Sequence, residues 1–198
     1  MTVSKKVLLN VEAKTALIKG ANIVADAVKS TIGPKGGLVA IENSIGQPHL
    51  TKDGVSVASN IFLEDPVENL GAQIIKQVSS KTATDTGDGT TTATVLAQKI
   101  INSVDISLPP AELNWVKKGI DEATNFAINH IQTNISSPCT NPDDLLNVAI
   151  ISANGDTSIG KIAQEAILRV GLDGIVRVEQ GSSFQDSINV QEDRKSVV

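Results

Sequence analysis

Gly87-Asp88-Gly89-Thr90-Thr91-Thr92 lies between two segments with helical hydrophobic spacing, so it is expected to form a tight turn that opens onto the N-terminus of a helix. Its two glycines let the backbone adopt positive φ angles and approach a ligand closely. The first turn of the following helix offers unpaired N–H groups, and the threonines add hydroxyl groups. We therefore expect a phosphate group to bind here, with Mg²⁺ between the phosphate and the carboxylate of Asp88. A plain Asp-Gly turn before a threonine-capped helix would explain the same residues, because short glycine-rich motifs often match by chance.

The composition of the chain is that of a soluble globular protein, with 40% hydrophobic and 20% charged residues among 198. Aromatic residues make up only 2%, so few side chains are available to stack on nucleic-acid bases. The net charge of −5 also argues against binding to a phosphate backbone. The N-terminus lacks the apolar region of a signal peptide, and no apolar run approaches the length of a membrane span. We expect a cytoplasmic protein without nucleic-acid or membrane partners.

Hydrophobic periodicity divides the first 134 residues into helices and one β-hairpin. Asp65-Pro66-Val67-Glu68 has the N-cap, the proline and the acidic residue of a helix start. The expected elements are a weak strand at residues 3–9, a helix at 12–30, strands at 38–42 and 48–51, a glycine-centred loop at 52–56, a helix from 66 to about 81, and further helices after the 87–92 turn and after Pro109-Pro110.

The composition changes at residues 134–142, where Ser, Pro, Cys, Thr and Asn cluster, and we place a domain boundary there. Two shorter helices are expected beyond it, at about residues 142–152 and 156–170. Alternating residues at 174–179 and 187–190 then predict a small hairpin. This second part is too small to bury a core of its own. The predicted fold class is mainly α with small β-hairpins.

Three loops are candidate binding segments, at residues 31–35, 52–54 and 87–92. Each joins two predicted elements and combines glycine with hydroxyl, amide or charged groups, and loops on a rigid scaffold often carry binding residues. If the helices align antiparallel, the three loops meet at one end of the bundle. Three unrelated turns would be the simpler explanation. The chain has no Walker-type G-x-x-x-x-G-K-[ST] motif, so the site would not be an ordinary P-loop.

The same three loops resemble the nucleotide-site segments of group I chaperonins, the GroEL-type family of bacteria, mitochondria and plastids. The similar segments are Thr31-Ile32-Gly33-Pro34-Lys35-Gly36, Thr51-Lys52-Asp53-Gly54-Val55-Ser56-Val57 and the eleven residues 87–97. Ile151-Ser152-Ala153-Asn154 and residues 170–174 are also similar to that family. The resemblance runs collinearly from about residue 3 to about residue 192, and several separate motifs in the family's order make it specific.

The resemblance implies a fold and a division into domains. Residues 1–134 look like the N-terminal half of a GroEL-like equatorial domain, a helical ATPase body whose hairpin reaches the neighbouring subunit. Residues 135–192 look like the first half of the intermediate domain, the hinge that transmits the nucleotide state. The family's apical domain and the second halves of the other two domains have no counterpart in these 198 residues.

The resemblance also assigns roles to individual residues around ATP and Mg²⁺, with K⁺ as a further cation. Asp53 would be catalytic and help to position the attacking water, and Asp88 would hold Mg²⁺. Such a site is chemically reasonable, since phosphoryl transfer needs positioning and charge neutralisation rather than a covalent nucleophile. The implied ATP-binding residues are Thr31, Ile32, Gly33, Pro34, Lys52, Asp53, Gly54, Gly87, Asp88, Gly89, Thr90, Thr91 and Thr92, with Ile151 and Ser152 bordering the site from the intermediate domain.

The function implied by the resemblance is that of an ATP-dependent molecular chaperone. In the family, subunits form a homo-oligomer of two stacked seven-membered rings, and the apical domain binds unfolded polypeptides and a co-chaperonin. Because the family's second catalytic aspartate and the far wall of the adenine pocket have no counterpart here, we expect residues 1–198 alone not to hydrolyse ATP.

The last six residues, 193–198, depart from the family pattern. Asp-Arg-Lys-Ser-Val-Val is what a common sequencing adapter encodes in one frame, so we expect the natural coding sequence to continue differently after Glu192. Two alternatives to the chaperonin subunit are open. One is a short polypeptide that binds nucleotide or chaperonin rings without ATPase activity, and the other is a helical domain that keeps the motifs by descent alone.

Overall fold

A computed structural model of the chain describes residues 7–33, 36–42, 48–139, 141–153, 155–171, 174–181 and 186–190. The chain divides into two compact units, residues 1–125 and 126–198. This division falls within a long helix, whereas the sequence analysis placed a domain boundary at residues 134–142. The family-based domain limits, 1–134 and 135–192, are a division by homology and remain a prediction.

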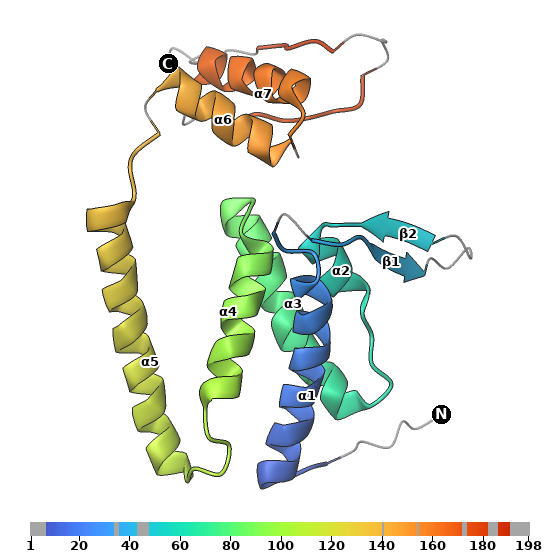
Figure 1. Cartoon of the computed structure of the whole chain (residues 1–198), viewed down its shortest axis with the longest axis vertical. Helices are drawn as coiled ribbons and strands as arrows, with labels where there is room; N and C mark the ends of the chain where they lie inside the picture. The colour runs from blue at the N-terminus through green and yellow to red at the C-terminus, as the bar shows by residue number, and fades with distance from the viewer. Residues whose placement is uncertain are drawn as a thin grey trace, which may run out of the picture. The chain divides into compact units, whose positions relative to one another are not determined.

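Helices α1 (Asn10–Lys29) and α3 (Pro66–Thr86) form the centre of the first unit (Figure 1). Both run toward the end of the unit where the β-hairpin lies, and α4 (Thr90–Ser103) runs back beside them. The core is built almost entirely of small and β-branched residues, as the low aromatic content requires. Its members are Ala21, Val24, Ala25, Val28, Val57, Ala58, Ala72 and Ile75.

Two glycines allow α1 and α3 to cross with their backbones in contact. A Cβ atom added to Gly20 would lie 1.7 Å from the carbonyl oxygen of Glu68, and one added to Gly71 would lie 1.9 Å from the carbonyl oxygen of Leu17. Any side chain at either position would overlap the partner helix. Small residues at such a crossing let two helices pack closer than the usual interaxial distance.

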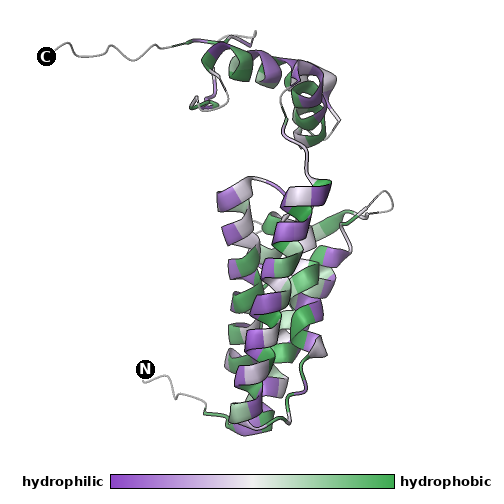
Figure 2. Cartoon of the chain, turned by 90° about the vertical axis from the view of Figure 1, so that its left-hand side faces the viewer, coloured by the Kyte–Doolittle hydropathy of each residue, from purple (hydrophilic) through white to green (hydrophobic). Residues whose placement is uncertain are grey.

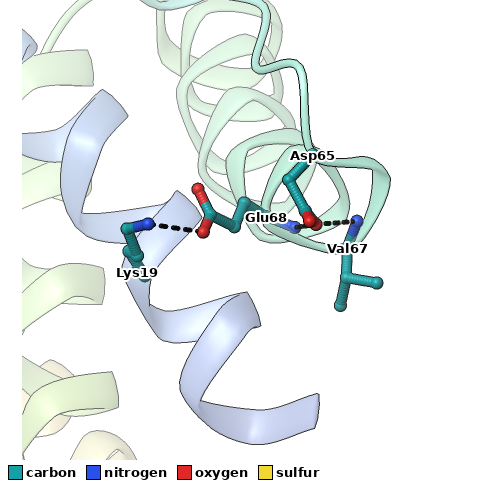
Figure 3. A network of polar contacts seen from close by, with 4 residues as sticks. All are labelled: Lys19, Asp65, Val67 and Glu68. Carbon is teal, nitrogen blue, oxygen red and sulfur yellow. Dashed lines mark hydrogen bonds and ion pairs between the residues drawn. The ribbon is translucent and has the colours of Figure 1, made fainter. Parts of the chain in front are cut away.

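The start of α3 is fixed by its N-cap, as the sequence predicts. The side chain of Asp65 accepts hydrogen bonds from the N–H groups of Val67 (2.8 Å) and Glu68 (3.1 Å). The Glu68 carboxylate in turn lies 2.6 Å from the ammonium group of Lys19 on α1 (Figure 3). Because the Lys19 side chain is 63% exposed, this ion pair contributes about 1 kcal/mol at most to the crossing.

The predicted hairpin is confirmed as β1 (Val39–Glu42) paired antiparallel with β2 (Pro48–Thr51), with Val39 opposite Thr51. The predicted turn between the strands lies outside the described residues. The glycine-centred loop expected at residues 52–56 is wrong from Gly54 onward, because a short helix, α2 (Gly54–Asn60), begins there. Val57 and Ala58 of this helix are buried in the core, and that packing stabilises a helix too short to form alone.

Helix α4 packs through polar as well as apolar residues. Its buried positions are Thr94 and Gln98, whereas Leu96 is 58% exposed. The Gln98 side chain donates hydrogen bonds to Asn22 (3.1 Å) and Asp26 (2.8 Å) of α1. This polar contact sets the register of α4 against α1, because a slip would leave buried amide groups without partners.

The remaining helices agree with the sequence analysis. Helix α5 (Pro110–His130) has no buried residue and continues into the π-helical turn η1 (Ile131–Ile135). In the second unit α6 (Pro142–Ser152) packs against α7 (Thr157–Val170), which Asp156 caps through the N–H groups of Ser158 and Ile159. Hydrophobic and hydrophilic residues alternate along the helical ribbons in Figure 2, as expected of amphipathic helices. None of the helices in the described part of the chain combines the length and apolarity of a bilayer-spanning segment.

Two predicted β-segments are wrong where the structure describes them. Residues 7–9, the described end of the weak strand expected at 3–9, have no strand conformation, and the rest of that segment lies outside the described residues. The hairpin expected at 174–179 and 187–190 is also not formed by those residues. Ile175 and Val178 are each 93% exposed, and a two-stranded hairpin without a covering layer is marginal in water.

The α1–α3 crossing predicts a large difference between two glycine substitutions. Gly71→Ala should lower the free energy of unfolding by at least about 2 kcal/mol, because the new methyl group overlaps the Leu17 carbonyl. Gly119→Ala is the matched control, since nothing lies within 4 Å of its Cβ position in α5, and it should stabilise by up to about 1 kcal/mol. Urea denaturation followed by circular dichroism measures both values. Equal effects would show that the crossing is not tight.

Candidate functional site

The first candidate loop follows directly from the end of α1. The hydroxyl group of Thr31 donates to the carbonyl oxygen of Val28 (2.7 Å), which holds Thr31 against the last turn of the helix. Gly33 has a φ of 81°, a conformation that favours glycine, and Ile32 is 46% exposed. The N–H of Gly37 donates to the carbonyl oxygen of Ser30 (2.9 Å) and closes the loop. Pro34, a predicted site residue, lies outside the described residues.

Asp53 is the N-cap of α2. Its Oδ2 atom accepts hydrogen bonds from the N–H (2.9 Å) and the hydroxyl group (2.6 Å) of Ser56, and its Oδ1 atom has one long contact of 3.4 Å with the N–H of Val55. Burial raises the pKa of Asp53, but the hydrogen bonds from Ser56 and Val55 outweigh it and hold the pKa below its ordinary value. The result is an exposed carboxylate with one oxygen, Oδ1, largely free for a ligand. Lys52, beside it, is also exposed.

The central turn depends on two glycines with positive φ. Gly87 (φ 72°) ends α3, and Gly89 (φ 77°) precedes α4. Between them, Asp88 accepts a hydrogen bond from the N–H of Gly89 at Oδ1 (2.6 Å), and its carbonyl oxygen accepts one from the Thr86 hydroxyl group (2.7 Å). The second carboxylate oxygen of Asp88, Oδ2, has no hydrogen-bond partner among the described residues. It is available to a cation.

The N-terminus of α4 offers a set of hydrogen-bond donors without partners among the described residues. The first intrahelical bond runs from Ala93 N–H to the carbonyl oxygen of Gly89 (2.9 Å), so the three preceding N–H groups have no intrahelical acceptor. No side chain caps this end of the helix. The threonine hydroxyl groups there likewise make no hydrogen bond with described residues, unlike the hydroxyl groups of Thr82, Thr84 and Thr86, which donate to carbonyl oxygens one turn earlier. Such an end suits an anion.

Gly54 lies in close contact with two segments that are distant in the sequence. A Cβ atom on Gly54 would lie 2.5 Å from the hydroxyl oxygen of Thr91 and 3.1 Å from a methyl carbon of Val28. The start of α2 therefore touches both the start of α4 and the last turn of α1. The described residues of the three loops lie at one end of the unit, the end nearest the hairpin (Figure 1). Helix α4 runs antiparallel to α1 and α3, but α1 and α3 run in the same direction, so the antiparallel alignment considered from the sequence holds only for α4.

The remaining predicted residues, Ile151 and Ser152, belong to the second unit. They end α6, and Ile151 is 71% exposed. Among the described residues no group of three or more His, Cys, Asp or Glu side chains could hold a metal ion, so Asp88 would act as a single carboxylate ligand. This fits Mg²⁺, which proteins often bind through one or two carboxylates together with phosphate oxygens.

Sequence reasoning missed the two hydroxyl groups that shape the loops. Ser56 anchors Asp53, and Thr86 anchors the turn at Asp88. The sequence signal for this cap is Asp53 itself, because aspartate is a preferred N-cap whose side chain accepts hydrogen bonds from N–H groups two or three residues later. Gly54 and the β-branched Val55 and Val57 have low helix propensity, so the local sequence does not predict a helix after this cap.

Comparison with known proteins identifies the family and the fold of the chain. The sequence profile of the TCP-1/cpn60 chaperonin family matches residues 24–191. This chain belongs to the TCP-1/cpn60 chaperonin family. The match includes all three loops, so the chaperonin resemblance seen in their motifs is confirmed at the level of the family.

Solved chaperonin structures share the fold of this chaperonin chain. One is the chaperonin gp146 from the bacteriophage EL 2 (Pseudomonas aeruginosa), crystallised in the presence of ATP-BeFx. Its crystal form I matches with a TM-score of 0.67 and 28% identity over 81% of this chain and 28% of that chain. Crystal form II matches with a TM-score of 0.64 and 29% identity over 79% of this chain and 28% of that chain.

A group III chaperonin in the open state matches with a TM-score of 0.62 over 80% of this chain and 32% of that chain. At 24% identity this likeness shows the fold alone. The chain thus spans less than a third of the length of these chaperonins. The predicted fold class, mainly α with small β-hairpins and a GroEL-like equatorial body, is confirmed, with a two-stranded sheet at β1 and β2 among the described residues.

The Asp53 cap predicts a pH-dependent contribution of Ser56 to stability. A carboxyl group whose pKa is lowered by folding stabilises the protein above its ordinary pKa of 3.8, and this stabilisation is lost as pH falls through the folded-state value. Ser56→Ala should raise the pKa of Asp53 and lower stability at neutral pH, and the loss should vanish at low pH. Carboxyl ¹³C NMR titration measures the pKa. Ser59→Ala, on the same helix but with no side-chain hydrogen bond among the described residues, should leave it unchanged.

Proposed function

We propose that this chain carries the N-terminal part of the Mg·ATP site of a group I chaperonin subunit, an ATP-dependent molecular chaperone. The observation that carries the proposal is the contact of Gly54 with Thr91, which joins the Asp53 loop to the free N-terminus of α4. The assignment to group I, within the chaperonin family, rests on the motifs of the three loops.

The phosphate chain would bind at the N-terminus of α4. Unpaired N–H groups and hydroxyl groups of Thr90, Thr91 and Thr92 face no competing acceptor among the described residues, and the helix dipole favours negative charge there. The glycines at 87 and 89 let the backbone approach the phosphates, and Lys52 adds a positive charge from the neighbouring loop. Thr31, Ile32 and Gly33, with Pro34, would cover the nucleotide from the end of α1.

The two carboxylates have separate roles in this proposal. Asp88 would hold Mg²⁺ through Oδ2, because Oδ1 is engaged by the N–H of Gly89. When bound, the metal neutralises phosphate charge and orients the phosphate oxygens. Asp53 would orient the attacking water through Oδ1, since Oδ2 is held by Ser56. Asp53, whose pKa lies below its ordinary value of 3.8, is ionised at neutral pH as an unperturbed aspartate is, so it can accept a hydrogen bond from water.

The proposal also includes the domain limits, oligomeric state, partners and location of the complete subunit, which are inferred from the resemblance to group I chaperonins. It comprises domains at 1–134 and 135–192, with Ile151 and Ser152 bordering the nucleotide, and a homo-oligomer of two stacked seven-membered rings. It also comprises unfolded polypeptides and a co-chaperonin as partners of the complete subunit, K⁺ as a further cation, and the cytoplasm as its location.

Nucleotide binding by this chain tests the site directly. Isothermal titration with Mg·ADP should detect binding, and Asp88→Asn should weaken it about tenfold with Mg²⁺ present but not in EDTA, because only the metal contact is lost. Asp85→Asn is the matched control, an exposed carboxylate in the last turn of α3 without a partner among the described residues. If the wild-type chain does not bind, or if both variants bind equally well in Mg²⁺, the proposed site is wrong.

Asp53→Asn separates the structural role of Asp53 from its chemical role. Asn is as good an N-cap as Asp, so stability should change by less than about 0.5 kcal/mol and Mg·ADP binding should persist. ATP hydrolysis, measured as phosphate release by the complete subunit that carries this sequence, should fall about 100-fold or more. Asp53→Ala should in addition cost about 1 kcal/mol of stability. Unchanged hydrolysis in Asp53→Asn would remove Asp53 from the catalytic role.

A further inference from the structure

Lys76 on α3 is buried to an unusual degree for a lysine. The residue is 7% exposed, and its ammonium group lies 3.2 Å from the carbonyl oxygen of Ser59 and 3.7 Å from the centre of the Phe62 ring. Lysine is almost never this buried unless its charge has partners. Burial lowers the pKa of Lys76, because removal from water disfavours the charged form of the ammonium group. The contacts with Ser59 and Phe62 offset that cost.

The two partners of Lys76 lie at the C-terminal end of α2 and just beyond it. The Ser59 carbonyl is one of the last four of the helix, which have no intrahelical donor, and a positive charge there also complements the helix dipole. Phe62 lies in the link from α2 to α3, and its ring interacts with the ammonium group through a cation–π contact. Lys76 therefore attaches the end of α2 and the link to the middle of α3.

Helix α2 depends on such attachments for its position. It has seven residues, far fewer than an isolated helix needs in water. Its N-terminal end is held by the Asp53 cap and by the contact of Gly54 with Thr91, and its buried face by Val57 and Ala58. The C-terminal end is held by Lys76. Since α3 continues without interruption from Lys76 to Thr86, the same helix also carries the turn that contains Asp88.

We propose that Lys76 is a positioning residue for Asp53. By holding the Ser59 carbonyl and the Phe62 ring, it fixes α2 to α3 and so sets the place of Asp53 relative to the Asp88 turn. This proposal rests on the proposed function for the role of Asp53. Its structural content, that the ammonium group of Lys76 keeps α2 and its N-cap in place, can be measured independently of nucleotide.

The alternative is that Lys76 contributes only to general stability. Lys76→Met discriminates between the two, because methionine keeps the long apolar stem and removes only the charge. Replacing a buried charge with an apolar group of similar size is often neutral or stabilising for the whole fold. A variant that melts no earlier than the wild type but has a looser α2 would therefore isolate the positioning role.

NMR measurements on the 198-residue chain provide the test. In Lys76→Met, amide hydrogen exchange within α2 should accelerate about tenfold while the amides of α1 and α3 keep their protection, and the pKa of Asp53 should move up toward its ordinary value as the Ser56 contacts weaken. Mg·ADP affinity should fall severalfold.

Lys76→Arg should restore part of each effect because it retains a cation. Lys81→Met, on the same helix at an exposed position without a partner among the described residues, should match the wild type.

Unchanged α2 exchange and an unchanged Asp53 pKa in Lys76→Met would overturn the proposal. If that variant lowers the melting temperature of the whole unit, Phe62→Leu provides a second test, because the ring is 73% exposed and its removal leaves the core intact. The same changes in α2, in smaller degree, would support the proposal, and their absence would overturn it. A wild-type chain that fails to bind Mg·ADP would contradict the proposed function alone, since exchange and the Asp53 pKa still report on Lys76.

Discussion

The backbone contact between α1 and α3 at Gly20 and Gly71 is the constraint on which the rest of the first unit depends. With no side chain at either position, the two helices approach until each glycine touches a carbonyl group of the other. The core beyond the crossing is then narrow enough to be filled by Ala, Val and Ile alone. The C-terminal ends of α1 and α3 lie at the same end of the unit, where the candidate loops at residues 31–35 and 87–92 begin.

At that end, local backbone chemistry sets the conformation of each loop, whereas long-range packing sets the positions of the loops relative to one another. The positive φ angles at Gly33, Gly87 and Gly89 and the Asp53 cap are local features, each made within a few residues. The position of α2, which packs against α1, α3 and α4, brings these local features together at one end of the unit. A seven-residue helix has little stability of its own, so the geometry of the site is a property of the whole unit.

Polar groups inside the unit add specificity to a core of small residues. The contacts of Gln98 with Asn22 and Asp26 fix α4 against α1, and Lys76 fixes α2 against α3. Apolar contacts between Ala and Val side chains tolerate sliding, whereas a buried amide or ammonium group has few acceptable positions. The chemistry proposed for Asp53 and Asp88 needs loops held in a defined arrangement, and these polar contacts supply it.

Features that depend on neighbouring residues can be predicted from the local sequence. The helix starts at Asp65 and Asp156 and the hairpin at residues 38–51 follow from caps and periodicity, and the loop motifs indicate the chaperonin family. Phosphate binding at the 87–92 turn stays a prediction. Three features could not be predicted from local sequence: residues 54–60 are helical, α4 buries Thr94 and Gln98, and residues 174–179 and 187–190 form no strands. In each of these cases contacts between residues far apart in the chain, or their lack within the described residues, outweighed the local propensity.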